Sequence, residues 1–451
     1  MAEITREDRQ KKITFQRFSS EITQEYERLR ELPDYFPELD YFLDLLKEGQ
    51  DPSVVEKRVQ KPVVALMCLQ APLELFHACG LHPFKIFGGS QVTTRLSSPV
   101  LPPVMCPMLR SALGTLMLGK GFSSGNGSDN SAELKDTKNT SFSFWGNRKD
   151  KGNGTYRPVG DFKAWVTPTT CDWVVKLDEL LYLCGVENKT PAHRLELPHT
   201  KDRPESQERW LEEIYLLKKF LLVQAGMKKL QAKVLNRSMD LYQQSWKLFS
   251  SLIDLKRQGL VSLSWFLVIA NSFFYDDIEI WMEELKKVLV CFRKRNVQKI
   301  GPRVFVAGSP IFFPNLKMAR IIEEAGLVVV MDDLCSSERL FPGAVFFDDY
   351  SEHGLLKALT QRYHQGCLCP TFADNDRRVN NILAPAHKEL YDGVIFHVLK
   401  GCHPFDLESL SLEAKIKGEG LKYLKLETDY TAEDSQTLLT RLEAFRSALV
   451  G

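Results

Sequence analysis

Short apolar runs, each followed by a helical stretch, most restrict what this chain can fold into. The run Pro62-Val-Val-Ala-Leu-Met-Cys68 precedes a helical stretch at 72–79, and a run at 303–307 precedes a helical stretch that ends at Gly326. A strand, a helix and a second strand in this order imply parallel pairing with a right-handed crossover. Continuous apolar runs, rather than alternation, are typical of strands covered by helices on both faces. The pattern therefore predicts an α/β protein with parallel sheets.

Two such segments occur, and 451 residues exceed what one hydrophobic core usually supports. We predict two doubly wound parallel-sheet domains of the Rossmann or flavodoxin type, with an N-terminal helical cap and a helical connector. The predicted parts are a cap of short amphipathic helices (1–60), a first α/β domain (61–204) with an inserted surface loop rich in Gly, Ser, Asn and Lys (120–158), the connector (205–300) and a second α/β domain (301–451). The expected strands are 62–68, 85–87, 162–166, 303–307, 327–331, 393–396 and 421–426.

Charge and hydropathy restrict the partners and the compartment. The 59 basic and 58 acidic side chains nearly cancel, and no long run of one sign appears, so neither nucleic acid nor a membrane is an expected partner. The first residues are charged where a signal peptide is apolar, and no stretch approaches the roughly 20 apolar residues that span a bilayer. We expect a cytoplasmic protein.

The ten cysteines are too few for a disulfide scaffold, and the cytosol would keep them as thiols. Ligands bind beyond the carboxyl ends of strands in open parallel sheets. Four cysteines follow predicted strands and two follow segments expected to be extended, each next to a proline; these six are Cys68, Cys171, Cys335 and Cys402, then Cys106 and Cys369. Cys367 lies beside Cys369, so the choice between them stays open. Cys79, Cys184 and Cys291 lie in helical stretches and are assigned to packing, which is the ordinary role of a buried thiol.

No Cys-x-x-Cys motif occurs, so a local ferredoxin-type or zinc-ribbon site is not encoded. Any ligands must converge from distant loops. Thiolates in a dry pocket suit iron–sulfur chemistry, whose potential the protein sets through charge, hydrogen bonds and burial.

Several ordered motifs resemble the 2-hydroxyacyl-CoA dehydratase and benzoyl-CoA reductase superfamily. The first is Cys68-Leu-Gln-Ala-Pro-Leu-Glu-Leu-Phe-His-Ala-Cys-Gly80, which is similar to the opening motif of the superfamily. Further similar segments follow in order: Met105-Cys-Pro-Met-Leu-Arg110, Pro168-Thr-Thr-Cys-Asp172, Ala307-Gly-Ser-Pro310, Asp332-Asp-Leu-Cys335, Asp392-Gly-Val-Ile-Phe396, Lys400-Gly-Cys-His-Pro-Phe405 and Leu426-Glu-Thr-Asp-Tyr430. The resemblance covers residues 62–447 apart from the inserted loop.

The resemblance implies an iron–sulfur component that receives low-potential electrons from a separate ATP-hydrolysing activator with its own cluster. Two cofactors are compatible with it. Dehydratase subunits resemble the chain at Cys68, Cys106 and Cys402, which would hold a [4Fe–4S] cluster used for ketyl-radical elimination of water from a 2-hydroxyacyl-CoA. The double-cubane branch needs six thiolates, and the chain offers Cys68, Cys106 and Cys171, then Cys335, Cys369 and Cys402. We favour that branch, as a reductase of a small substrate; a non-catalytic scaffold or cluster carrier is a third interpretation.

The remaining assignments concern ATP, proton transfer and assembly. Residues 114–121 imitate a phosphate-binding loop but lack its terminal hydroxyl residue, so ATP is assigned to the activator. His403 is the preferred proton carrier over His77 and His397, with a structural histidine as the alternative for each. A homodimer, or a heterodimer with a paralogous subunit, is the expected assembly, and the substrate is a small molecule or an acyl-CoA.

Overall fold

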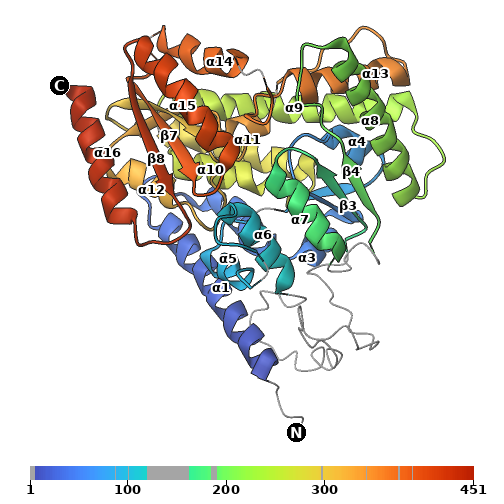
Figure 1. The fold of residues 1–451 in the computed structure, drawn as a ribbon, viewed down its shortest axis with the longest axis horizontal. Coiled ribbons are helices and arrows are strands. Elements are labelled where there is room, and N and C mark those ends of the chain that lie inside the picture. Colours follow the sequence, from blue (N-terminus) through green and yellow to red (C-terminus); the bar gives the residue numbers. More distant parts are fainter. Residues whose placement is uncertain are drawn as a thin grey trace.

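The computed structural model describes residues 6–86, 88–99, 101–118, 162–183, 190–295, 298–341, 343–373, 376–388 and 390–451. The predicted inserted loop and Cys184 lie outside these ranges. Two four-stranded parallel sheets flanked by helices make up the described α/β fold (Figure 1), so the predicted fold class is confirmed.

The first sheet has the strand order β2-β1-β3-β4. Its strands are β1 (Val63–Leu66), β2 (His82–Lys85), β3 (Ala164–Pro168) and β4 (Ala192–Leu195). The helices along this half are α4 (Leu73–Ala78), α5 (Gln91–Leu96), α6 (Pro107–Met117) and α7 (Asp172–Leu183). Because the chain leaves β1 toward β2 and returns on the other side as β3, the sheet has a topological switch point between β1 and β3, where ligands bind in folds of this type.

The second sheet repeats this topology with the order β6-β5-β7-β8. Its strands are β5 (Arg303–Gly308), β6 (Val328–Asp332), β7 (Gly393–Leu399) and β8 (Lys422–Thr428). The helical elements are α12 (Lys317–Glu324), η3 (Glu338–Leu340), α13 (Glu352–Thr360), the π-helical turn η4 (Gln361–Gln365), α14 (Asp376–Ala386), α15 (His403–Gly418) and α16 (Ser435–Val450). The switch point here lies between β5 and β7.

Cap and connector helices join the two halves. The cap comprises α1 (Arg6–Arg30), η1 (Pro37–Leu39), α2 (Asp40–Glu48) and α3 (Pro52–Val59), and the connector comprises α8 (Pro204–Gln224), α9 (Ala232–Arg257), α10 (Leu263–Ser272) and α11 (Ile278–Arg295). Helix α9 contacts α4 of the first half and β6 of the second, and it runs across both halves in Figure 1. None of the helices in the described ranges combines the length and apolarity needed to cross a bilayer.

One hydrophobic core includes residues of the cap, the connector and both sheets. Phe42, Trp265 and Ile395 come from these different parts and are all fully buried within it. Every residue of α10 is buried, which is the expected behaviour of a helix enclosed by protein on all sides. The other face of the second sheet has a smaller core of its own, with Phe305 and Phe396. The halves are therefore held together by apolar packing.

Three details differ from the sequence-based expectations. The second strand ends at Lys85, whereas we expected it at 85–87. Strand β4 was not predicted, because it is a four-residue edge strand with one buried residue and no apolar run. The cap was expected to contain short helices, but α1 has 25 residues, since its intermittent apolar positions continue in one helical register along the core.

A buried ion cluster ties the connector to the second sheet. Lys256 of α9 is fully buried and its ammonium contacts Asp332 at the end of β6 and Glu338 (2.6 Å). Removing one partner of a buried pair leaves uncompensated charge, which costs far more than the intact pair contributes.

We expect Lys256→Met to lower the free energy of unfolding by about 3–5 kcal/mol, because Asp332 and Glu338 would stay buried without their cation. Urea unfolding followed by circular dichroism measures this change. The matched control is Lys286→Met on α11, which removes an exposed pair with Glu283 and should cost at most about 0.5 kcal/mol. Equal losses in the two variants would contradict the assigned role of Lys256.

Candidate functional site

The predicted cysteines lie at the carboxyl ends of both sheets. Cys68 and Cys171 follow β1 and β3, which flank the first switch point, and Cys335 and Cys402 follow β6 and β7. Cys106 is the N-cap residue of α6, as Cys402 is of α15. Cys369 was expected after an extended segment, but it follows the helical turn η4. All six are free thiols and are buried or partly buried.

Cys106 and Cys402 form the first group of thiols, together with Cys171. A hydrogen bond to Cys106 is the largest cause of the raised pKa of Cys402, ahead of burial. Burial raises the pKa of Cys171 to about 12, and Cys402 and Cys68 add to this effect. Cys106 also belongs to a small apolar cluster with Leu399 and Tyr430, against which Trp173 and Cys402 pack. This group combines loops of both halves.

Gly401 permits the contact between the two loops of this group. Its φ is +78°, and a Cβ at this position would lie 2.1 Å from the carbonyl oxygen of Val104. Its own carbonyl accepts a hydrogen bond from Trp173 Nε1 (2.9 Å). A glycine is required here both by the left-handed backbone and by the close approach of the loop before Cys106.

Cys68, Cys335 and Cys369 form the second group. Burial raises the pKa of Cys68, with Cys335 contributing and Lys85 opposing. Burial likewise raises the pKa of Cys369 well above its usual range, and Cys367 and Cys68 add to it. Because Cys171 interacts with both Cys68 and Cys402, the two groups adjoin. Electrostatic interactions therefore connect all six predicted cysteines as neighbours.

Cys367 lies beside the second group in a different setting from Cys369. The Gln70 amide donates to Cys367 Sγ (3.1 Å), and Gln70 Oε1 accepts from Cys68 Sγ (2.7 Å). Besides burial, Cys68 contributes to the raised pKa of Cys369. Cys369 interacts electrostatically with Cys68, and Cys367 is linked to Cys68 through the hydrogen bonds of Gln70, so both cysteines lie near Cys68 and the choice of Cys369 stays a prediction.

The loop carrying these two cysteines is fixed by charged and polar groups from both halves. The carbonyl oxygen of Leu368 accepts from Arg339 and from Arg378 Nη1 (3.0 Å). Lys201, which follows β4, donates to the carbonyl of Cys367, and Ala373 N donates to His199 O (2.8 Å). The loop of the second half is thus anchored on the carboxyl edge of the first sheet.

A buried network fixes the helical turn before this loop. Glu74 of α4 is fully buried and accepts from Arg362 Nη1 (2.6 Å) and Tyr363 Oη (2.9 Å), both in η4. Leu73 N donates to the same tyrosine oxygen (3.3 Å). Because η4 directly precedes the cysteine loop, these contacts link α4 to the position of that loop. A π-helical turn is rare and is often found at a functional site.

Cations surround the second group of thiols. The Lys85 ammonium lies over the rings of Phe274 (5.8 Å) and Phe312 (5.6 Å), and burial lowers its pKa to about 8, with Cys335 and Cys68 opposing this shift. Burial acts to lower the pKa of Arg339, but Asp333 and the thiols of Cys335 and Cys369 raise it above its usual range. Lys85, Arg339 and Gln70 were not predicted as site residues. The available signals were a lysine at a predicted strand and polar residues close to Cys335 and Cys68 in the sequence.

The candidate histidines have different environments. His403 is exposed at the start of α15, with its ring centroid 5.5 Å from that of Trp173 in the first thiol group. His397 lies inside β7, where it is paired with Ser309 O (3.0 Å) and burial lowers its pKa to about 4. Only His403 of these two has an open path to solvent, and its role as proton carrier stays a prediction.

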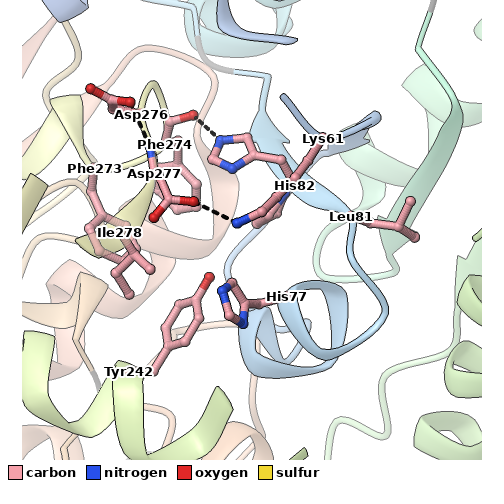
Figure 2. Close-up of a pocket in the computed structure, with 11 residues that line it drawn as sticks. Lys61, His77, Leu81, His82, Tyr242, Phe273, Phe274, Asp276, Asp277 and Ile278 are labelled. Atoms are coloured by element: carbon pink, nitrogen blue, oxygen red, sulfur yellow. Dashed lines mark hydrogen bonds and ion pairs between the residues drawn. The ribbon is translucent and has the colours of Figure 1, made fainter. Parts of the chain in front are cut away.

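His77 lines a small pocket of about 10 Å³ between α4, β2 and the connector (Figure 2). It is hydrogen-bonded to Ser238 (3.1 Å), while Lys61 is paired with Asp277 (2.5 Å) and His82 with Phe274 O (2.9 Å). The volume is close to that of one water molecule, and these polar groups already have partners. We assign this pocket to packing.

Two of the remaining cysteines and the described part of the segment that imitates a phosphate-binding loop lie in helices or in the core. Cys79 is buried in the core and Cys291 packs against it from α11, in agreement with their assignment to packing. Residues 114–117, which imitate a phosphate-binding loop, belong to helix α6.

The six cysteines fit an iron–sulfur cluster in their donor chemistry. Within the described residues, no three His, Cys, Asp or Glu side chains are arranged to hold a single metal ion. A cluster spreads its thiolate ligands over several irons, and soft sulfur ligands suit iron–sulfur assemblies. Nε and Nη2 of Arg339, beside the second thiol group, are buried without a hydrogen-bond partner. These unsatisfied donors suit an acceptor such as a cluster sulfide.

The fold and site define a class of α/β proteins in which two parallel sheets bring cysteines from their carboxyl ends to one shared site. The chain belongs to the 2-hydroxyglutaryl-CoA dehydratase D-component family, whose model matches residues 68–449. This confirms the superfamily inferred from the sequence motifs, and the chain is a dehydratase-like subunit of that family.

Two relatives carry names of dehydratase subunits. The putative dehydratase subunit YjiM of Escherichia coli (strain K12) is 25% identical over 394 residues, which cover 85% of this chain and 90% of that protein. The (R)-phenyllactyl-CoA dehydratase beta subunit of Clostridium sporogenes is 20% identical over 228 residues, which cover 49% of this chain and 58% of that protein. The family therefore supports an enzymatic, lyase-type role.

We expect Gly401→Ala to separate the loops of Cys106 and Cys402, because the new Cβ would collide with Val104 and the backbone would be strained by about 1–3 kcal/mol. Diamide oxidation of cluster-free protein, followed by peptide mapping, measures formation of the Cys106–Cys402 disulfide, which should fall sharply. Gly418→Ala is the control, since a Cβ there meets nothing within 4 Å. Unchanged disulfide formation in Gly401→Ala would show that this contact does not depend on the glycine.

Proposed function

We propose that the chain is the iron–sulfur component of an ATP-dependent low-potential reductase, which binds a double-cubane cluster and reduces a small molecule or acyl-CoA. Electrons come from a separate ATP-hydrolysing activator. The protein acts in the cytoplasm as a homodimer, or as a heterodimer with a paralogous subunit.

The grouping of the thiols carries this proposal. The electrostatic interactions among the thiols support one group of Cys106, Cys171 and Cys402 and an adjoining group of Cys68, Cys335 and Cys369, with Cys171 interacting with both Cys402 and Cys68. Each group draws on both halves of the chain. Six thiolates in two sets of three suit two joined cubanes. The dehydratase assignment uses only Cys68, Cys106 and Cys402, and it leaves three of the six neighbouring thiols without a ligand role.

The side chains around the thiols would prepare the site for a low-potential cluster. When bound, the cluster would supply single low-potential electrons. Burial of Cys106 with Leu399 and Tyr430 keeps water from the first group, and Lys85 and Arg339 offset negative charge beside the second. His403, exposed beside Trp173, would exchange a proton with solvent.

An activator would dock over the loops of Cys106 and Cys402. Val104 in the first loop is 66% exposed, an apolar position open to a partner. Lys400 is exposed and paired with Asp429 (3.1 Å), whereas Arg110 is hydrogen-bonded to Ser98 (2.8 Å). Charge reversal at Lys400 therefore tests docking more cleanly than reversal at Arg110, which would also disturb local structure.

The second candidate is a 2-hydroxyacyl-CoA dehydratase subunit with one [4Fe–4S] cluster on Cys68, Cys106 and Cys402. The names of both relatives support it, since each is described as a dehydratase subunit. In this case Cys171, Cys335 and Cys369 would be neighbours of the cluster without binding iron.

Anaerobic iron and sulfide analysis separates the two candidates. We expect about eight irons per chain, and we expect Cys171→Ser or Cys335→Ser alone to lower the iron content, because both are ligands only in the larger cluster. About four irons, unchanged by either substitution, would favour the dehydratase.

Cys291→Ser is the matched control, because this cysteine packs on α11 away from the site and should leave iron unchanged. Substrate reduction with activator, ATP and reductant tests for catalysis. Cluster binding without any turnover would favour a carrier, and ATP hydrolysis by the chain alone would contradict the two-component assignment.

A further inference from the structure

Arg339 lies next to the second group of thiols and has two guanidinium nitrogens without hydrogen-bond partners. It lies on η3, four residues after Cys335, and its guanidinium group stacks 5.7 Å from the centroid of the Phe405 ring. One nitrogen donates to the carbonyl of Leu368, between Cys367 and Cys369. The other two nitrogens, Nε and Nη2, are shielded from solvent and have no hydrogen-bond partner.

Buried donors without acceptors are costly, so such a group requires an explanation. Asp333 offers one, since its Oδ1 is also buried without a partner. However, Asp333 already binds Arg378 through Oδ2, and Arg378 is bound to Glu408 as well (2.9 Å). The charges that act on Arg339 are therefore those of Asp333, which already has Arg378 as its cation, and of the thiols of Cys335 and Cys369.

From this geometry we infer that Arg339 donates hydrogen bonds through Nε and Nη2 to the cluster held by Cys68, Cys335 and Cys369, and thereby raises its reduction potential. The inference rests on the proposed function. Reduction adds negative charge, which a buried guanidinium and its N–H groups stabilise more in the reduced than in the oxidised state.

The two thiol groups then differ electrostatically. Lys85 and Arg339 adjoin the second group, whereas the first is packed with Trp173, Leu399 and Tyr430. Lys85 and Arg339 would therefore favour reduction of the part of the cluster held by Cys68, Cys335 and Cys369.

Redox titration of the anaerobically purified protein tests this role. Arg339→Gln should lower the midpoint potential by an amount equivalent to at least a tenfold change in the equilibrium constant, which is about 59 mV for one electron. Arg339→Lys keeps the charge and loses the fork of donors, so it should give a smaller negative shift. Iron content and thermal stability are measured on the same samples. Lys286→Gln removes an exposed positive charge on α11 and should leave the potential unchanged.

Each other outcome overturns the inference in a recognisable way. Unchanged midpoints with a lowered melting temperature would assign Arg339 to a structural pair with Asp333. If Arg339→Gln loses iron, the midpoint potential of Arg339→Lys is the deciding measurement. An unchanged midpoint potential in Arg339→Lys would leave Arg339 only the role of holding the Leu368 loop in place. A wild-type protein without iron would overturn the proposed function together with the inference, whereas normal iron content with unchanged potentials would overturn the inference alone.

Discussion

The shared hydrophobic core holds the carboxyl edges of two separate sheets against each other, and the candidate site depends on this constraint. Each half alone supplies only part of either thiol group. Helix α10 is buried along its whole length, and its Asn271 donates to Ser336 O (3.0 Å) beside Cys335 and accepts from Phe313 N (3.2 Å). Apolar packing of the connector thus positions loops that are hundreds of residues apart in the sequence.

Buried ion pairs fix the positions of the loops and helices around the site, which apolar packing alone does not define. Lys256 links α9 to Asp332 at the end of β6, Glu74 links α4 to η4, and Arg378 links Asp333 to α15 through Glu408. Apolar contacts are non-directional, whereas these pairs are lost if a loop shifts by a few ångströms. Buried ion pairs contribute little net stability, and their value here is in defining one arrangement of the cysteine loops.

The site combines dry aromatic surroundings on one side with buried cations on the other. A thiol in such a place is held in its neutral form by burial, as the raised pKa values of Cys68 and Cys171 show. Binding of the proposed cluster would require thiolates, and the neighbouring Lys85 and Arg339 would offset the negative charge that burial alone opposes. The same cations explain why polar residues occur at the end of an apolar strand and beside Cys335.

The sequence by itself determined the parallel α/β architecture, because short apolar runs such as 303–307, each followed by a helical stretch, are typical of strands buried on both faces, and it also determined the family. The assignment of the six cysteines as ligands stays a prediction. It could not place β4, whose polar edge residues lack that pattern, or the length of α1. It also could not find Arg339 and Lys85 beside the thiols. Those features were decided by tertiary structure, since they depend on which loops meet when the two halves pack, and local periodicity carries no information about such long-range contacts.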